Sequence, residues 1–336
     1  MNLDATIRSE NRILYMNGLT DIPGVRVGHA SDFVGITGCT AILCEGGAVG
    51  GVDIRGSATG TEELDLLNPL HMTERVHGVL LSGGSAFGLE AASGVRRFLE
   101  SKGVGFDTGV AKVPLVVGAI LFDLAIGKAS VRPTREMGES AAAAATSGPV
   151  GEGSVGAGTG ATVGKLFGMG RAMKSGVGSA TVQLPGGALV SALAAVNAFG
   201  DVLDPATGKV LAGARTAKDS REFSNTAEAM KHGAMDRNAS GAFRKTNTTL
   251  VVVATNVALS KTGATKLAQL ASLGVARTIS PVWTTFDGDL VIALSVGGMR
   301  GELNTLGVGA AEAVSQAIVR AVKLAKGAGG VPGLAG

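Results

Sequence analysis

Glycine constrains this chain more than any other residue type, because 53 of its 336 residues are glycine. That share is about twice the ordinary ~7%. The glycines follow no Gly-X-Y period, which excludes a collagen-like triple helix. They lie between short apolar runs, as expected where a chain makes many tight turns and where backbones approach closely. We therefore expect many short strands joined by sharp turns.

Apolar runs of strand length, bounded by Gly, Pro or Asp, dominate the first half of the chain and recur near its end. The predicted strands are residues 25–27, 39–43, 51–54, 76–81, 113–121, 188–196, 249–254 and 290–294. Apolar residues at helical spacing predict helices over residues 86–99, 136–146, 264–277 and 309–326. Helices set apart from grouped strands favour a layered α+β or αββα architecture over a regular βαβ array.

The composition excludes several classes of protein. Hydrophobic residues make up 45% of the chain and charged residues 17%, which is typical of a folded globular protein. The formal net charge is only +3, and no basic–aromatic interleaving is present, so we expect no nucleic-acid partner. The longest apolar run, residues 113–122, falls short of the ~18 residues that a membrane-spanning helix needs, so no membrane association is expected. The polar N-terminus lacks the apolar core of a secretory signal, which predicts a cytoplasmic protein.

The cysteines and histidines show no pattern typical of a disulfide or a metal site. Cys39 and Cys44 have an odd spacing, which places them on opposite faces of a strand and predicts buried free thiols. No histidine forms an HExxH motif or a zinc-ligand spacing with a cysteine. We therefore expect neither a metal nor another cofactor.

One glycine-rich loop resembles a nucleophile elbow but does not match it. Residues 83–88 follow a predicted strand and open a predicted helix, yet Phe87 stands where the elbow requires glycine. Backbone N–H groups of such a loop can still face an anion. The candidates for an oxyanion or substrate loop are Gly83, Gly84 and Ser85.

A second glycine tract, residues 156–165, resembles a phosphate-binding loop and also fails. Thr159 holds the position of the first glycine, and Leu166 replaces the required Ser or Thr. No clear strand feeds the tract, and no βαβ unit surrounds it, so a dinucleotide site is equally unsupported.

The most informative position lies where a polar segment meets an apolar strand. Residues 213–247 are polar and predict a surface linker or mobile loop, whereas residues 249–254 are strongly β-branched and predict a central buried strand. The Thr248 hydroxyl stands at this junction and could attack the Asn247 carbonyl. Cleavage would free an α-amine with a pKa of ~7.7–8, which can replace the histidine of a triad as base. Asn-Thr-Thr is a common tripeptide, so these residues alone do not establish cleavage.

Several blocks along the chain match one family in its order. They are residues 20–29 (TDIPGVRVGH), 51–56 (GVDIRG), 81–89 (LSGGSAFGL), 156–165 (GAGTGATVGK), 195–198 (AVNA), 247–249 (NTT) and 286–289 (FDGD). On these blocks the chain resembles the S58 peptidase family, also called P1, over roughly residues 17–300. This family holds DmpA-type L-aminopeptidase/D-esterases, β-peptidyl aminopeptidases and nylon-oligomer hydrolases.

The resemblance implies a fold and a maturation step. The fold would be a four-layer αββα sandwich of the N-terminal-nucleophile-hydrolase type, which ornithine acetyltransferases also resemble. Residues 1–16 would form an N-terminal extension, and residues 17–336 a single catalytic domain. Self-cleavage would divide that domain into an α chain, 1–247, and a β chain, 248–336, held together noncovalently.

The resemblance also assigns roles to individual positions. Thr248 matches the nucleophile, and Asn247 the residue whose peptide bond is broken. Asn197 matches an amide that donates a hydrogen bond to the oxyanion. Lys165 matches a lysine that helps hold the hydroxyl and charge state of the nucleophile.

Two further carboxylates and one aromatic residue complete the set. Asp287 and Asp289 match acidic positions that orient or counter the new α-ammonium, although without the resemblance a solvated Asp-Gly-Asp turn would be the simpler interpretation. Some members of the family carry Tyr where this chain has Phe122. If that Tyr donates to the oxyanion, Phe122 cannot, and we expect Phe122 to pack into the core instead.

The resemblance implies an aminopeptidase or amidohydrolase that acts on a small peptide, amide or ester through an acyl-enzyme on Thr248, without a cofactor. Members are commonly homotetramers, which predicts a homo-oligomer of processed αβ units. Two alternatives stay open. One is an acyltransferase like ornithine acetyltransferase, and the other is an unprocessed homologue that binds without catalysing.

Overall fold

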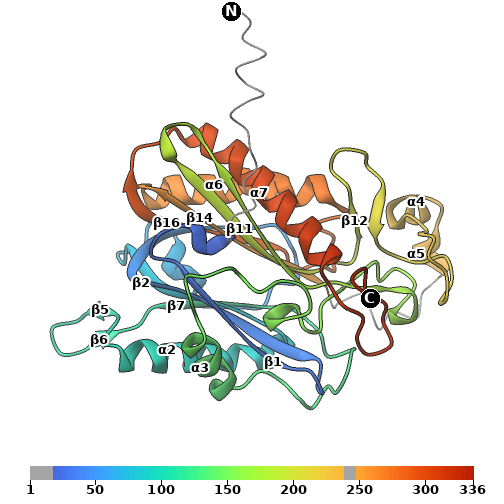
Figure 1. Cartoon of the computed structure of the whole chain (residues 1–336), viewed down its shortest axis with the longest axis horizontal. Coiled ribbons are helices and arrows are strands. Elements are labelled where there is room, and N and C mark those ends of the chain that lie inside the picture. Colours follow the sequence, from blue (N-terminus) through green and yellow to red (C-terminus); the bar gives the residue numbers. More distant parts are fainter. Residues whose placement is uncertain (1–17, 238–246) are drawn as a thin grey trace, which may run out of the picture.

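The computed structural model describes residues 18–237 and 247–336. The predicted N-terminal extension and residues 238–246 of the polar segment lie outside the described residues. The largest element is a nine-stranded sheet with the strand order β10-β11-β14-β16-β2-β4-β7-β3, in which β1 also pairs with β2 (Figure 1). Its strands are β1 (Arg26–Asp32), β2 (Thr37–Ile54), β3 (Thr61–Glu62), β4 (Arg75–Ser82), β7 (Val116–Ile120), β10 (Val177–Gln183), β11 (Leu189–Asn197), β14 (Thr248–Val257) and β16 (Leu290–Met299).

The remaining elements are shorter strands and six helices in the described part of the chain. The helices are α2 (Ala91–Ser101), α3 (Arg135–Ala143), α4 (Thr226–Lys231), α5 (Ala234–Arg237), α6 (Lys261–Thr278) and α7 (Leu303–Lys323). The short strands are β5 (Phe106–Asp107), β6 (Lys112–Val113), β8 (Thr162–Val163), β9 (Met173–Lys174), β12 (Asp201–Leu203), β13 (Val210–Ala212) and β15 (Ile279–Ser280).

The long strand β2 connects the two halves of the sheet. Its first part pairs with β1 and β4, its last part pairs with β16, and the register with β4 shifts between Leu43 and Ala48. Residues 39–43 and 51–54, predicted as separate strands, are therefore one strand. The two sheets implied by the resemblance are correspondingly two halves of one hydrogen-bonded sheet.

Three apolar clusters separate four layers, which confirms the αββα sandwich. Alternate residues of β14 face different clusters: Val251 and Val253 pack against α6 and α7, whereas Leu250 and Val252 face the other half of the sheet. A third cluster lies between that other half and the helices α2 and α3. Figure 1 accordingly shows α6 and α7 on one side of the sheets and α2 and α3 on the opposite side. This alternation is the period of two that a strand buried on both faces requires.

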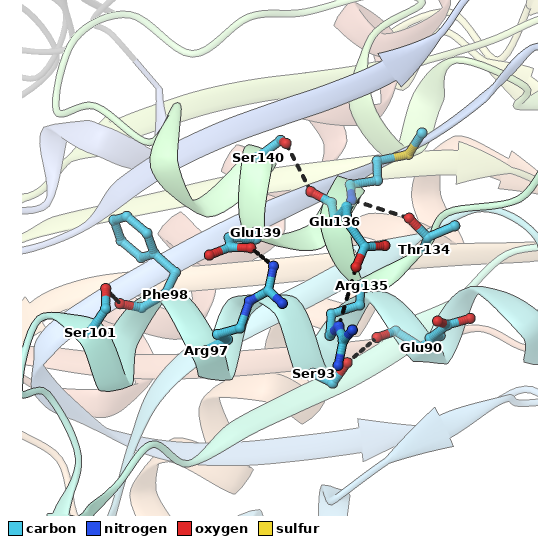
Figure 2. A network of polar contacts seen from close by, with 11 residues as sticks. Glu90, Ser93, Arg97, Phe98, Ser101, Thr134, Arg135, Glu136, Glu139 and Ser140 are labelled. Atoms are coloured by element: carbon cyan, nitrogen blue, oxygen red, sulfur yellow. Dashed lines mark hydrogen bonds and ion pairs between the residues drawn. The ribbon is translucent and has the colours of Figure 1, made fainter.

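The outer helices α2 and α3 approach closely because glycine stands at the contact. A Cβ on Gly94 would lie 1.8 Å from the carbonyl oxygen of Arg135, so no larger residue fits there. Figure 2 shows the polar side of the same contact, where Arg97 of α2 forms an ion pair with Glu139 of α3. Thr134 caps α3 by accepting a hydrogen bond from the Met137 amide.

Several predicted boundaries were wrong by a few residues. The helix predicted to begin at residue 86 begins as a 3₁₀ helix (Ser85–Glu90), and α2 follows it. The last helix begins at Leu303 instead of residue 309, because Glu302 accepts hydrogen bonds from two first-turn amides and starts it earlier. The segment predicted as a linker carries α4 and α5.

The predicted free thiols are confirmed. Cys39 and Cys44 are both buried and unpaired, and they belong to different apolar clusters on opposite faces of β2. Within residues 18–237 and 247–336, no helix is both long and apolar enough to cross a bilayer.

Candidate active site

Thr248 is the first residue of β14, and its side chain is only 3% exposed. It shares the face of Leu250 and Val252, so it points toward the space between the two halves of the sheet. Its Oγ1 donates a hydrogen bond of 2.5 Å to the carbonyl oxygen of Asn247. The hydroxyl therefore lies against the peptide bond that it is predicted to attack.

A second donor reaches the same carbonyl oxygen. The N–H of Gly288 donates to the Asn247 oxygen at 2.8 Å, within a parallel bridge between Asn247 and Asp287. A Cβ on Gly288 would lie 2.8 Å from Thr248 Oγ1 and 2.7 Å from the Ala58 oxygen. Gly288 thus brings an N–H group within the 2.7–3.1 Å that an oxyanion donor requires. Gly288 was not among the predicted site residues, although it lies between the two that were, Asp287 and Asp289.

Replacing Gly288 by Ala is expected to slow the breakage of the Asn247–Thr248 bond by about 10²-fold, because the new methyl group displaces the hydroxyl or the donor. Gly298→Ala in β16 is the matched control, since a Cβ on Gly298 meets nothing within 4 Å. Quantifying full-length and cleaved chains on denaturing gels would check this, and equal cleavage in the two variants would contradict it.

Asn197 is the cross-strand neighbour of Thr248 in the antiparallel pair β11–β14, and both side chains lie on the same face of the sheet. The Asn197 Oδ1 accepts hydrogen bonds from Lys165 Nζ at 2.7 Å and from the Thr162 N–H at 3.1 Å. Its Nδ2 donates to the carbonyl oxygen of Phe122 at 3.0 Å. Phe122 follows β7 in the other half of the sheet, so the amide is held from both layers. The predicted oxyanion role of Asn197 remains a prediction.

Lys165 is 3% exposed, and its ammonium group donates to the backbone oxygen and to the Oδ1 of Asn197, at 2.8 and 2.7 Å. Burial lowers the pKa of Lys165 to about 7, although Asp287, Asp289 and Asp123 act in the opposite direction. Near neutral pH this residue is thus divided between amine and ammonium. A buried amine in that state can accept a proton, which the ordinary lysine in water cannot do efficiently.

Asp287 and Asp289 are buried, so the interpretation as a solvated turn is wrong. Asp289 accepts hydrogen bonds from the N–H groups of Thr249 and Trp283, at 2.5 and 3.3 Å. Asp287 accepts from the Phe199 N–H at 3.2 Å. Burial raises the pKa of both carboxyl groups, and for Asp289 burial and the neighbouring Asp287 raise it to about 7. Both carboxylates therefore lie beside the start of β14, where an α-ammonium would appear.

The loop of Gly83, Gly84 and Ser85 uses its N–H groups within the fold. Gly83 donates to the Gly38 oxygen at 2.9 Å, and Ser85 donates to the Leu121 oxygen at 3.0 Å. Gly84 donates to a carboxylate oxygen of Asp123 at 2.7 Å. These three N–H groups already donate to partners within the fold, and none of them donates to Thr248. A substrate-binding role for this loop remains a prediction.

Phe122 is half-buried and does not join the apolar core, contrary to expectation. It lines a small cavity of about 10 Å³ together with Thr162, Lys165 and Met169. That volume is about the room that one water molecule needs. The backbone carbonyl of Phe122 accepts a hydrogen bond from Asn197, and its ring borders this cavity instead of the apolar clusters.

The arrangement combines the parts of an acyl-transfer site. It brings together a hydroxyl that can act as a nucleophile, an amine of lowered pKa, and amide and backbone N–H donors. All of them lie in a buried environment, where electrostatic interactions are strong. Within the described part of the chain, no cluster of three or more His, Cys, Asp or Glu side chains could hold a metal ion.

Comparison with known proteins gives a consistent result. The profile of peptidase family S58 matches residues 17–335. A protein of Mycobacterium tuberculosis named as an uncharacterized aminopeptidase is 40% identical over 343 residues, which covers 94% of this chain and 96% of the relative. A 6-aminohexanoate-oligomer endohydrolase of Kocuria sp. is 30% identical over 318 residues, covering 90% of this chain and 85% of that protein.

Solved structures share the fold. The L-aminopeptidase D-Ala-esterase/amidase of Ochrobactrum anthropi, described as a variant of the Ntn hydrolase fold, superposes with a TM-score of 0.68 at 20% identity. That superposition covers 92% of this chain and 86% of the other. A Burkholderia sp. β-aminopeptidase superposes with a TM-score of 0.66 at 24% identity, covering 95% and 91% of the two chains.

Proposed function

Because this chain belongs to peptidase family S58, we propose that it cleaves itself between Asn247 and Thr248 and then uses the N-terminal Thr248 to hydrolyse amide bonds. The observation that carries the proposal is the position of the Thr248 hydroxyl, 2.5 Å from the Asn247 oxygen. The Gly288 N–H contacts the same oxygen and can stabilise the negative charge that forms on it.

The proposed self-cleavage has two steps. Thr248 Oγ1 attacks the Asn247 carbonyl carbon, its proton passes through the site to the Lys165 amine, and a tetrahedral oxyanion forms beside Gly288. The bond to the Thr248 nitrogen then breaks, and that nitrogen takes up a proton, which leaves an ester. Water hydrolyses the ester to an Asn247 carboxylate and a free Thr248.

In the processed enzyme, the freed α-amine of Thr248 acts as the base that activates its own hydroxyl. The hydroxyl attacks the substrate carbonyl, Asn197 donates to the oxyanion, and the amine product leaves. Water then releases the acyl group. Asp287 and Asp289, which lie beside the start of β14, orient the α-amine and balance its charge.

The proposed substrates are small peptides, amides or esters, from which an N-terminal residue is removed. The relatives support this class, since one is named an aminopeptidase and another a 6-aminohexanoate-oligomer endohydrolase. The α and β chains should remain together, because β14 pairs with β11 on one side and β16 pairs with β2 on the other. Separation would expose core residues of both chains. We propose that these αβ units form homo-oligomers.

Intact-mass spectrometry of the purified protein under denaturing conditions tests the proposal directly. Two masses, the smaller beginning at Thr248, are expected in place of the 33.4 kDa full-length chain. A single full-length mass in a folded sample that hydrolyses no aminoacyl p-nitroanilide would refute it and would favour a binding protein.

Acyl transfer to an amine is the competing activity. We expect water to be the main acyl acceptor. Substrate should therefore be hydrolysed without any added amine, and added hydroxylamine should divert only part of the acyl-enzyme to hydroxamate. Product formation that depends on an amine acceptor and stops in its absence would identify an acyltransferase instead.

Replacing Phe122 by Tyr is expected to raise the rate of amide hydrolysis, about 3- to 10-fold. The added hydroxyl extends into the cavity beside Lys165 and Thr162, where it can donate to an oxyanion. The measurement is kcat on an aminoacyl p-nitroanilide. Phe122→Leu serves as the control without a hydroxyl, and an equal or lower rate in the Tyr variant would show that oxyanion stabilisation here does not need this position.

A further inference from the structure

A second lysine lies behind the site and has no part in the chemistry described above. Lys174 in β9 is completely buried. Its ammonium group donates to three backbone oxygens, those of Ser175 at 2.7 Å, Ala161 at 2.8 Å and Gly158 at 3.3 Å. Burying a cation among neutral carbonyl groups is costly.

The backbone that Lys174 holds leads directly into the site. Lys174 is the cross-strand neighbour of Thr162 in the short pair β8–β9, and the turn from Gly158 to Ala161 immediately precedes Thr162. The Thr162 N–H donates to Asn197 Oδ1, the oxygen that also accepts from Lys165. The position of the Asn197 amide thus depends on the turn that the Lys174 ammonium holds.

A buried carboxylate packs on the same turn. A Cβ on Gly160 would lie 2.7 Å from an oxygen of Asp123. The Asp123 carboxylate accepts from Thr37 Oγ1 at 2.7 Å and from the Gly84 N–H at 2.7 Å, so it is fixed in place. The charged groups that act on Lys165 in this region are Asp287, Asp289, Asp123 and Lys174.

We propose that Lys174 is a positioning residue of this active site, which fixes the turn behind Asn197 and acts on Lys165 by charge repulsion through the protein interior. The inference rests on the proposed self-cleavage, in which Lys165 accepts the Thr248 proton. Lys174 itself contacts no reacting atom.

The charge of Lys174 acts on the protonation of Lys165. Burial lowers the pKa of Lys174 to about 7, and Asp123 opposes that shift. The positive charge of Lys174 in turn lowers the pKa of Lys165. Removing this charge should therefore raise the pKa of Lys165. Because self-cleavage needs the neutral amine of Lys165, the rising limb of the pH–rate profile should then move to higher pH.

Two variants distinguish the effect of the Lys174 charge from the effect of its hydrogen bonds to the backbone. Lys174→Gln removes the charge and keeps hydrogen-bond donors for the carbonyls, whereas Lys174→Arg keeps a positive charge at every working pH. Lys261→Gln is the matched control, since the Lys261 ammonium also donates to three backbone oxygens, of Leu66, His71 and Thr73. Lys261 follows the opposite end of β14 from Thr248, roughly 30 Å away at ~3.4 Å per strand residue.

The measurement is the rate of self-cleavage from pH 5 to 9.5, with precursors made by cell-free translation and Thr248→Ala as the uncleaved standard. Lys174→Gln should shift the midpoint of the rising limb upward by about 0.3 to 0.5 pH unit. Lys174→Arg should leave it at or below the wild-type value, and Lys261→Gln should leave it unchanged.

An unshifted midpoint in Lys174→Gln, or equal upward shifts in the Gln and Arg variants, would overturn the role of Lys174 while self-cleavage of the wild type stands. If the Gln variant does not fold, the Arg variant decides, because a folded Arg variant that fails to cleave, or cleaves with an upward shift, also overturns it. Absence of cleavage in the wild type would instead overturn the proposed function.

Discussion

Thr248→Ala is expected to yield a folded, uncleaved chain that hydrolyses amides at least about 10³-fold more slowly than the wild type. In the proposed mechanism one side chain serves both reactions, because its hydroxyl contacts the Asn247 carbonyl oxygen and, once freed, acts as the nucleophile. Intact mass and the initial rate on an aminoacyl p-nitroanilide measure the two losses. The fold should persist, since the change removes a side chain at the end of a strand.

Two controls make the result specific. Thr248→Ser keeps a hydroxyl and should still cleave, at a changed rate. Thr255→Ala removes another buried hydroxyl of β14, one that donates to the Leu189 oxygen at 2.8 Å far from the junction, and should cleave like the wild type. Retained hydrolysis by the Thr248→Ala protein would assign the nucleophile to another residue.

Lys165→Met is expected to slow self-cleavage by about 10²- to 10³-fold, which lies within the ~10²- to 10⁴-fold that a general base contributes. A methionine fills the space of the lysine stem but cannot accept a proton or donate to Asn197. In the wild type, the rate should rise as the pH increases through about 7, because burial lowers the pKa of Lys165 to that value and only the neutral amine can act as base. The variant should lose that rise.

Time courses of chain cleavage at several pH values measure both the loss of rate and the loss of the pH dependence. Lys261→Met is a suitable comparison, because it removes a lysine that holds three backbone oxygens outside the site and should keep both the rate and the pH dependence. A Lys165→Met chain that cleaves at the wild-type rate would show that another group takes the proton, and Asp289, with its pKa also raised to about 7, would then be the first to test.

The elements with the strongest local signal were predicted correctly. The β-branched run at residues 249–254 forms the interior of β14, and the amphipathic stretch at residues 264–277 lies within α6. Predictions from weaker local patterns were wrong where contacts between distant segments determine the secondary structure. Glycines within residues 37–54 suggested two strands, but pairing with β1, β4 and β16 keeps the segment extended throughout.

Some residues of the candidate site could likewise be predicted from the sequence, and others could not. Its neighbours marked Thr248 as a candidate, since a polar segment ends there and a buried strand begins, and the family resemblance gave it the predicted role of nucleophile. Gly288 and the carbonyl of Phe122 were not, because a backbone group carries no mark of its partners in the sequence. Lys174 was missed for a related reason, as its function depends on the turn that its ammonium holds.

The sequence by itself determined where the long, strongly patterned strands and helices form and marked Thr248 as a candidate nucleophile, because periodicity and the polar-to-apolar junction are local properties of the chain. The family resemblance added the roles. Only the tertiary structure decided that Thr248 and Asn197 lie side by side on the inner face, and that Lys165, Asp287 and Asp289 are buried near them. Strand register and desolvation create these relations, and both arise when segments distant in the chain pack together.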